Sequence, residues 1–245
     1  MSGETDRNML PTTILVLDAA PAGVAVRARA SLLTLVGADV EWHADREETG
    51  HEGISRLPLI AAECLRTEEG QRIRAGHGLI AVVTGPGSFT GLRTACALAE
   101  GLGLGTGCPV AGVSRGEALG SRLSARLRDE NLAGWLWFGQ ARRGRWFMEG
   151  ATTDGVKLPV RAVEIEGWVP PAGQWLLAGD AAHEAAGQMN GAVCLSDAFE
   201  AKPEEIARVA LAHLLADDLP RPVLPLYVDP PEAKLPAAGL RPAPV

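Results

Sequence analysis

One stretch of the chain, residues 79–105, predicts a buried strand, a tight glycine turn and a helix in direct succession. Its first five residues form a short apolar run rich in branched side chains, which is typical of a central parallel strand. Residues 85–87 follow as Gly-Pro-Gly, in which the two glycines permit backbone angles that other residues resist. Ser88 or Thr90 is a suitable N-cap for the helix. A unit of this kind points backbone N–H groups at whatever lies above the turn.

The turn matches no standard catalytic or nucleotide-binding signature. A P-loop requires a lysine, which is absent, and the dinucleotide fingerprint requires a glycine where Thr90 stands. A nucleophile elbow around Ser88 requires glycines where Pro86 and Thr90 stand. We therefore interpret Gly85, Gly87 and Ser88 only as a candidate contact for an anion or a nucleotide.

The composition indicates a globular protein. With 245 residues, 47% of them hydrophobic, the chain is long enough for one large or two small domains. Its net charge of −7 argues against direct nucleic-acid binding as its main activity. The cysteines are scattered, without a C-x-x-C, and are expected to be reduced core residues. Because neither a signal-peptide core nor an apolar run of about 18 residues is found, we expect a soluble cytoplasmic protein.

The hydrophobic periodicity predicts the order β-β-β-α-β-α-β-α up to residue 128. The expected strands are 13–18, 22–28, 40–44, 79–83 and 108–113, and the expected helices are 51–67, 90–105 and 115–127. Residues 68–78 are expected to be a polar loop, and Ser114 to cap the third helix. This order is the layout of the actin/Hsp70/sugar-kinase (ASKHA) lobe. The predicted fold is therefore α/β, with a mixed sheet in the N-terminal lobe.

A change of composition at residues 129–131 marks the expected end of this lobe, which we place at 12–128. The second lobe, 129–228, is expected to contain a hairpin over 133–149, strands at 175–180 and 224–228, and a helix at 203–216. Three arginines beside tryptophans in the hairpin would suit single-stranded nucleic acid, or else mark a basic turn above a core. The proline-rich segment 229–245 is expected to be extended or disordered.

Two charged residues stand at positions that suggest a ligand. Asp18 ends the first strand and could face a phosphate or a metal, or simply cap the turn that follows. Arg93 lies in the first turn of a helix, where the dipole disfavours a cation. It is expected either to meet a carboxylate or phosphate or to be solvated.

The helix at 90–105 is unusually rich in alanine and glycine. A glycine inside a helix costs about 1 kcal/mol relative to alanine. Close packing of another backbone normally offsets that cost, and this backbone could belong to the helix's own sheet or to a helix of another chain.

The motif Gly-Pro-Gly-Ser-Phe-Thr-Gly-Leu-Arg at 85–93, with Pro-Val-Ala-Gly-Val-Ser at 109–114, resembles the TsaB (YeaZ) family. Residues 51–60, 140–147, 177–180 and 225–229 resemble further landmarks of that family, so the resemblance covers about 12–230. Two departures stand out. Ala19 follows the first-strand aspartate where the family has Thr or Ser, and Gln140 replaces the aspartate of the hairpin.

The resemblance implies a two-lobed ASKHA fold and a role in making N6-threonylcarbamoyladenosine (t6A) at position 37 of tRNAs that read codons starting with A. In the family, the paralogous subunit TsaD carries the metal and nucleotide site, and an ATPase, TsaE, completes the complex. The chain is therefore expected to be a non-catalytic partner of TsaD, to form homodimers, to meet tRNA only indirectly and not to bind membranes. It would need no cofactor of its own, with ATP or ADP at the interface of the complex.

The family docks through two helices of the N-terminal lobe. The resemblance places the partner contacts on these residues: Ile54, Leu57, Ala61, Thr90, Arg93, Thr94, Ala95, Ala97, Leu98 and Gly101.

The residues independently favour an accessory role. TsaD-like chains carry histidines at i and i+4 on a helix, whereas His51 is followed by Ser55 at that spacing, and no other histidine pair has ligand spacing. Two alternatives remain open. One is an autonomous ASKHA ATPase or phosphotransferase that uses Asp18, and the other is a protease, for which no nucleophile–base pair is readable.

Overall fold

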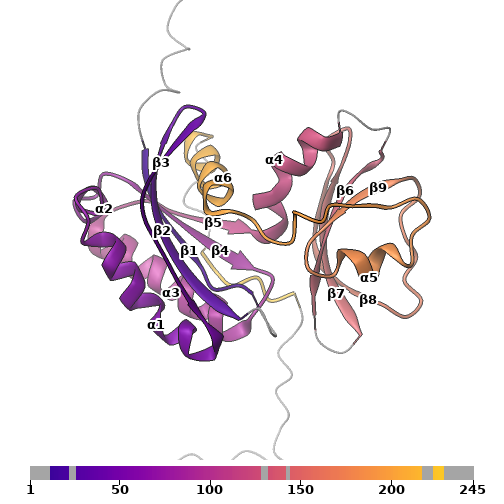
Figure 1. Cartoon of the computed structure of the whole chain (residues 1–245), viewed down its shortest axis with the longest axis horizontal. Coiled ribbons are helices and arrows are strands. Elements are labelled where there is room, and N and C mark those ends of the chain that lie inside the picture. The colour runs from indigo at the N-terminus through magenta and orange to yellow at the C-terminus, as the bar shows by residue number, and fades with distance from the viewer. Residues whose placement is uncertain (1–11, 22–25, 128–131, 142–143, 217–222, 229–245) are drawn as a thin grey trace, which may run out of the picture.

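The computed structural model describes residues 12–21, 26–127, 132–141, 144–216 and 223–228. Two lobes lie side by side, each built on a five-stranded sheet (Figure 1). No helix in these ranges has the length and apolar character needed to cross a membrane.

The first sheet has the strand order β3-β2-β1-β4-β5. The first three strands form an antiparallel meander, and β4 and β5 continue the sheet parallel to β1. The bounds are β1 Thr12–Asp18, β2 Arg27–Val36, β3 Asp39–Thr49, β4 Leu79–Gly85 and β5 Val110–Ser114. All residues of β4 are buried, as expected for a central strand.

Helices cover both faces of this sheet. On one face, α1 (Gly50–Leu65) and α3 (Phe89–Thr106) pack against each other, with the short α2 (Gly70–Arg74) beside α1 (Figure 1). On the other face lies α6 (Pro203–Leu215), which contacts β1, β2, β4 and β5. A separate hydrophobic core fills each side of the sheet.

The second sheet has the order β10-β9-β6-β7-β8. Its strands are β6 Gly134–Gln140, β7 Arg145–Thr152, β8 Lys157–Glu164, β9 Trp175–Ala178 and β10 Val193–Cys194. The helix α5 (Ala182–Ala186) packs on one face. The other face receives α4 (Arg115–Leu127), whose leucines pack against Trp135 and Trp137. Because α4 also contacts β4, β5 and α6, it connects the two lobes.

The predicted α/β class and the order β-β-β-α-β-α-β-α are confirmed, with one addition: α2 forms within the expected loop 68–78. The second strand starts at Arg27 rather than at residue 22, and residues 22–25 lie outside the described ranges. The first helix starts at Gly50, and Pro58 lies within it. Both predicted serine caps form: Ser88 Oγ accepts from Gly91 N–H at 3.2 Å, and Ser114 Oγ accepts from Glu117 N–H at 3.1 Å.

The chain returns to the first lobe near its end. The predicted boundary assigns α6 to the second lobe, whereas the helix packs on the first sheet. Residues 224–228, predicted as a strand, form no regular ladder, but Leu226 N–H donates to Thr84 O at 2.8 Å and Val223 joins the first core. The first lobe is therefore assembled from two separate parts of the sequence. The tail 229–245 lies outside the described ranges, so its predicted disorder stays a prediction.

Candidate functional site

The glycine turn after β4 packs against the loop that follows β1. Ser88 N–H donates to Ala20 O at 2.8 Å. A Cβ added to Gly87 would clash with Ala20 O, and one added to Gly91 would clash with Ala19 O. The glycines are therefore required because two backbones approach closely within this chain.

This packing occupies several backbone donors of the turn. Besides Ser88 N–H, the N–H groups of Gly91 and Leu92 donate to Ser88 Oγ and Ser88 O. An anion site at such a turn depends on N–H groups that are free to point at the ligand. At Gly85, φ is +121°, which favours glycine for conformational reasons alone. The turn shapes the junction between strand and helix, and the contact with an anion or nucleotide at Gly85, Gly87 and Ser88 stays a prediction.

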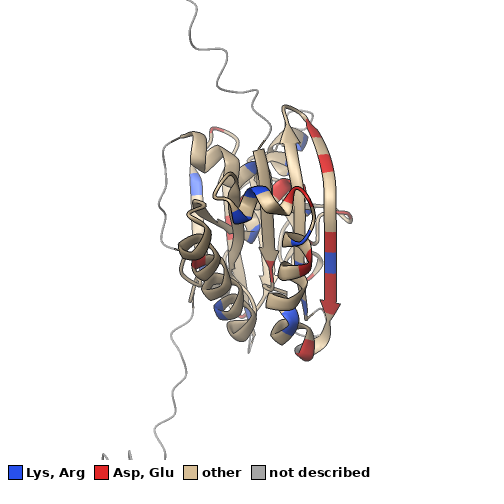
Figure 2. Ribbon diagram, turned by 90° about the vertical axis from the view of Figure 1, so that its left-hand side faces the viewer, with Lys and Arg blue, Asp and Glu red and all other residues tan. Residues whose placement is uncertain are grey.

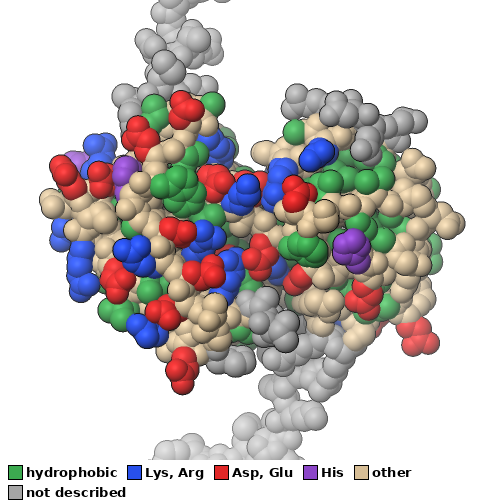
Figure 3. All heavy atoms as spheres, in the orientation of Figure 1, with side chains coloured by type: hydrophobic (Ala, Val, Ile, Leu, Met, Phe, Trp, Pro, Cys, Tyr) green, Lys and Arg blue, Asp and Glu red, His purple; other side chains and the backbone are tan. Residues whose placement is uncertain are grey.

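Asp18 is likewise occupied within the chain. Its Oδ1 accepts from Ala20 N–H at 2.9 Å, which is the turn-capping role, and its Oδ2 lies 3.5 Å from Arg27 Nη2. Arg27 also pairs with Glu47 at 2.7 Å and with Glu200 at 2.6 Å. Glu200 precedes α6, so the network ties the first sheet to the returning chain. Figure 3 shows charged side chains of both signs gathered along the boundary between the lobes.

A second polar cluster joins the lobes at the start of α4. Ser114 Oγ donates to Glu149 Oε1 at 2.6 Å, and Gly116 N–H donates to Glu149 Oε2 at 3.0 Å. Burial raises the pKa of Glu149 to about 7, and the nearby charge of Glu117 adds to the rise. Sequence reasoning missed Glu149. The available signal was a single acid inside the apolar run of a strand.

Arg115, the first residue of α4, reaches across the same boundary. Its guanidinium lies 4.9 Å from the ring centre of Trp137, and its Nη2 is 3.9 Å from Asp180 Oδ2. The side chain is buried. Cation–π and ion-pair contacts therefore hold the second sheet against the first lobe.

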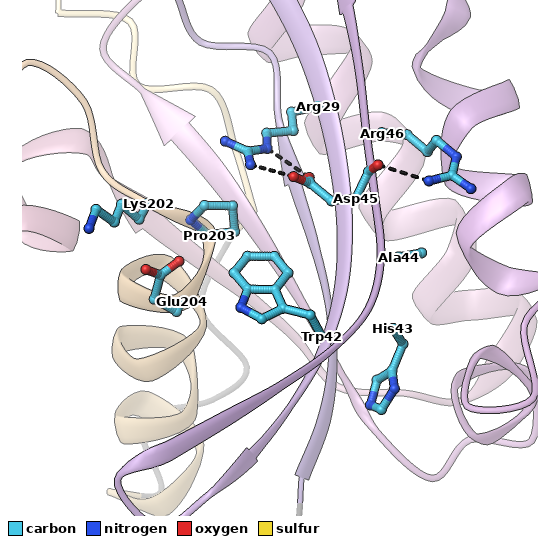
Figure 4. A pocket seen from close by; sticks show the side chains of 9 residues that line it. All are labelled: Arg29, Trp42, His43, Ala44, Asp45, Arg46, Lys202, Pro203 and Glu204. Atoms are coloured by element: carbon cyan, nitrogen blue, oxygen red, sulfur yellow. Dashed lines mark hydrogen bonds and ion pairs between the residues drawn. The ribbon is translucent and has the colours of Figure 1, made fainter.

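A hollow of about 590 Å³ opens between β2–β3 and the start of α6 (Figure 4). Arg29 forms two hydrogen bonds to Asp45 on its floor, and this pairing lowers the pKa of Asp45. Trp42, Lys202 and Glu204 form its sides. The charges of its lining are of both signs, and Arg29 and Asp45 neutralise each other. Neither here nor elsewhere in the described ranges could a group of three or more His, Cys, Asp or Glu side chains hold a metal ion.

The predicted partner contacts on α1 and α3 divide by burial. Four of them face the core of their own lobe: Ile54, Leu57, Ala61 and Ala95. Because these four side chains are buried within their own lobe, they offer a partner no surface. Thr90, Arg93, Ala97 and Gly101 are exposed, and Thr94 and Leu98 are half-buried.

The exposed side of α3 carries little side-chain volume. A Cβ at Gly101 or Gly105 would meet no other atom within 4 Å, whereas one at Gly103 would clash with Val110. Figure 2 faces this side of the molecule and shows few charged residues on α3 and many on the edge strand β3. We call the following exposed or half-buried residues the outer face: Leu59 of α1 with Thr90, Arg93, Thr94, Ala97, Leu98, Glu100, Gly101, Leu104 and Gly105 of α3.

The start of α3 holds Arg93 in place without an acid. The Arg93 guanidinium lies 5.2 Å from the ring centre of Phe89. It forms no ion pair with any residue that the structure describes. The carboxylate or phosphate expected from the sequence is therefore absent from its own lobe, within these ranges.

The chain resembles known proteins in part of its sequence and in its fold. Residues 75–131 match the family model described as "TsaD: tRNA N6-adenosine threonylcarbamoyltransferase". No curated protein matches the chain significantly. The structure of YeaZ from Pseudomonas aeruginosa is similar, with 19% identity, a TM-score of 0.63 and coverage of 88% of this chain and 99% of that one.

A second solved structure from Pseudomonas aeruginosa, of an uncharacterized protein with similarity to peptidase YEAZ, gives the same result. It has 20% identity and a TM-score of 0.64, and the match covers 89% of this chain and 100% of that one. The predicted resemblance to the TsaB (YeaZ) family and the two-lobed ASKHA fold are thus confirmed at the level of the fold.

Proposed function

We propose that this chain is a partner subunit of the machinery that synthesises t6A in tRNA, and that its outer face docks on a TsaD-like catalytic subunit. The observation that carries the proposal is the pair Gly101 and Gly105, above which the described chain leaves open space. Each glycine costs about 1 kcal/mol in a helix interior. A partner helix that approaches closely would use the space and offset that cost. The fold of YeaZ and the family match at 75–131 support this choice of partner.

We infer that the chain is an accessory subunit rather than a catalyst. An autonomous phosphotransferase of this fold would use Asp18, and the carboxylate is engaged by Ala20 N–H and Arg27. The N–H groups of Ser88, Gly91 and Leu92 at the glycine turn are engaged as well. The proposal extends to the other expected features of such a complex: a TsaE-like ATPase, ATP or ADP at the interface, indirect contact with tRNA, and a cytoplasmic location. A homodimer would use the same outer face and therefore compete with the TsaD-like subunit.

The test replaces Gly101 by leucine and measures binding to the TsaD-like subunit of the same genome. Added volume in a close helix contact should weaken the complex by about 100-fold, while the melting temperature stays the same or rises slightly. The matched control is Ala212→Leu, which adds the same side chain to an exposed position of α6, on the opposite face of the sheet.

The two variants are then compared in t6A synthesis with the TsaD-like and TsaE-like subunits, threonylcarbamoyl-adenylate and tRNA. Gly101→Leu should lose the stimulation that the unaltered chain gives, and Ala212→Leu should keep it. Unchanged binding by Gly101→Leu would rule out docking through α3. ATP hydrolysis by the isolated chain that disappears in Asp18→Asn would support the autonomous enzyme instead.

A further inference from the structure

An apolar patch lies at the start of α3, where the chain returns near its end. Phe89 is 48% exposed and Tyr227 is 49% exposed, and their ring centres are 5.2 Å apart. Leu224 and Leu226, on the same returning segment, are 68% and 37% exposed. Soluble proteins seldom gather several large apolar side chains on the surface without a use for them.

The returning segment, residues 223–228, is attached to the lobe at two points, and we call it the strap. Val223 is buried in the first core, and Leu226 N–H donates to Thr84 O at the end of β4. The attachments fix the backbone while Leu224 and Tyr227 stay exposed. The exposure therefore belongs to a segment that the sheet holds in position.

The patch is continuous with the outer face. Tyr227 contacts Phe89, and the guanidinium of Arg93 lies 5.2 Å from the ring centre of Phe89. Arg93 is itself part of the outer face and has no acidic partner among the described residues. A guanidinium that stacks on a ring keeps its N–H edge free for a carboxylate.

We propose that the strap and Phe89 form one docking surface with the outer face, for the same TsaD-like partner; this inference rests on the proposed function. The partner would bring an apolar side chain to Phe89 and Tyr227 and a carboxylate to Arg93. A second copy of this chain fits the patch less well. The strap and Phe89 include no acid, so this patch offers no carboxylate to the Arg93 of a second copy.

The test is a double variant, Leu224→Ser with Tyr227→Ser, in the full-length chain. We expect its affinity for the TsaD-like subunit to fall about 10- to 30-fold, because exposed aromatic anchors contribute strongly to interfaces, with no change in melting temperature. The matched control is Val169→Ser, which removes an exposed apolar side chain from the second lobe. Arg93→Glu should also weaken binding, and by a larger factor at low salt than at high salt, because salt screens the interaction between charges.

The outcomes separate the two proposals. If Gly101→Leu abolishes binding and the strap variant binds like the unaltered chain, the strap inference is wrong and the docking of α3 stands. If neither variant changes binding, both are wrong. Loss of self-association without loss of the heterodimer would assign the patch to a second copy. A chain shortened to end at Val228 tests whether the chain's own residues 229–245 cover the patch. If they do, the shortened chain should bind the TsaD-like subunit more tightly and exchange strap hydrogens faster. That result would overturn the proposal.

Discussion

The junctions β4–α3 and β5–α4 use the same local device for different purposes. In both, a serine caps the helix, and a nearby glycine allows close approach: Ser88 with Gly91, and Ser114 with Gly116. The first junction closes on neutral backbone carbonyls of its own lobe, whereas the second closes on the carboxyl group of Glu149 from the second sheet. The first should therefore be insensitive to pH, and the second should make the contact between lobes depend on it.

The largest expected effect is at the first junction. Gly91→Ala would push a methyl group into Ala19 O, so the backbone must move. We expect the free energy of unfolding to fall by about 3 kcal/mol, equally at pH 5 and pH 8. Urea denaturation checks this, with Gly105→Ala as the control, because a methyl group there meets open space. A Gly91→Ala protein as stable as the parent would show that the close approach is dispensable.

An intermediate effect is expected at the second junction. Burial raises the pKa of Glu149 from 4.5 to about 7, so between these values the folded state binds more protons than the unfolded state. The contribution of Glu149 to the free energy of unfolding therefore falls as pH rises from about 4.5 to about 7. Glu149→Gln keeps a neutral group that accepts from Gly116 N–H and removes the titration.

The variant should match the parent near pH 4.5 and be more stable by about 1–3 kcal/mol at pH 8. Denaturation across this pH range provides the measurement. The difference between the two proteins isolates Glu149 from other titrating groups, such as Glu200 and Glu205, whose pKa values burial also raises. Two parallel stability curves would mean that the junction does not respond to the charge of Glu149.

The smallest effect distinguishes glycines within α3 itself. Gly101→Ala should raise the free energy of unfolding by about 0.5–1 kcal/mol, because the methyl group meets nothing and alanine favours the helix. Gly103→Ala should lower it, because its methyl group would clash with Val110. The melting temperatures of the two variants and the parent provide the measurement. Equal shifts in the two melts would remove the distinction between a glycine needed by the fold and one left for a partner.

Local rules predicted the parts of the fold that depend on neighbours in sequence. The Ser88 and Ser114 caps and the bounds of α4 follow from residues within one or two turns. The packing of α6 on the first sheet could not be predicted in this way, because its periodicity identifies an apolar face but not the sheet that receives it. Glu149 was missed for the same reason, since its partners belong to another lobe.

The candidate site shows the same limit. Ile54, Leu57 and Ala61 recur at helical spacing on one face of α1, but a core-facing stripe and a partner-facing stripe have the same spacing. On α3, Ala95 and Ala97 look equivalent in sequence, although one is in the core and the other is exposed. Only the direction of each residue relative to the sheet separates the two roles.

The return of α6 has a consequence for the order in which the protein is made. The strands of the first sheet leave the ribosome early, yet one of their faces lacks its cover until Pro203–Leu215 has been synthesised. During most of translation, the apolar side chains of that face have no native partner from α6, which favours chaperone binding or aggregation. The lobe that starts first is therefore among the last to be completed, and translation products that stop before residue 203 should not yield a stable N-terminal lobe.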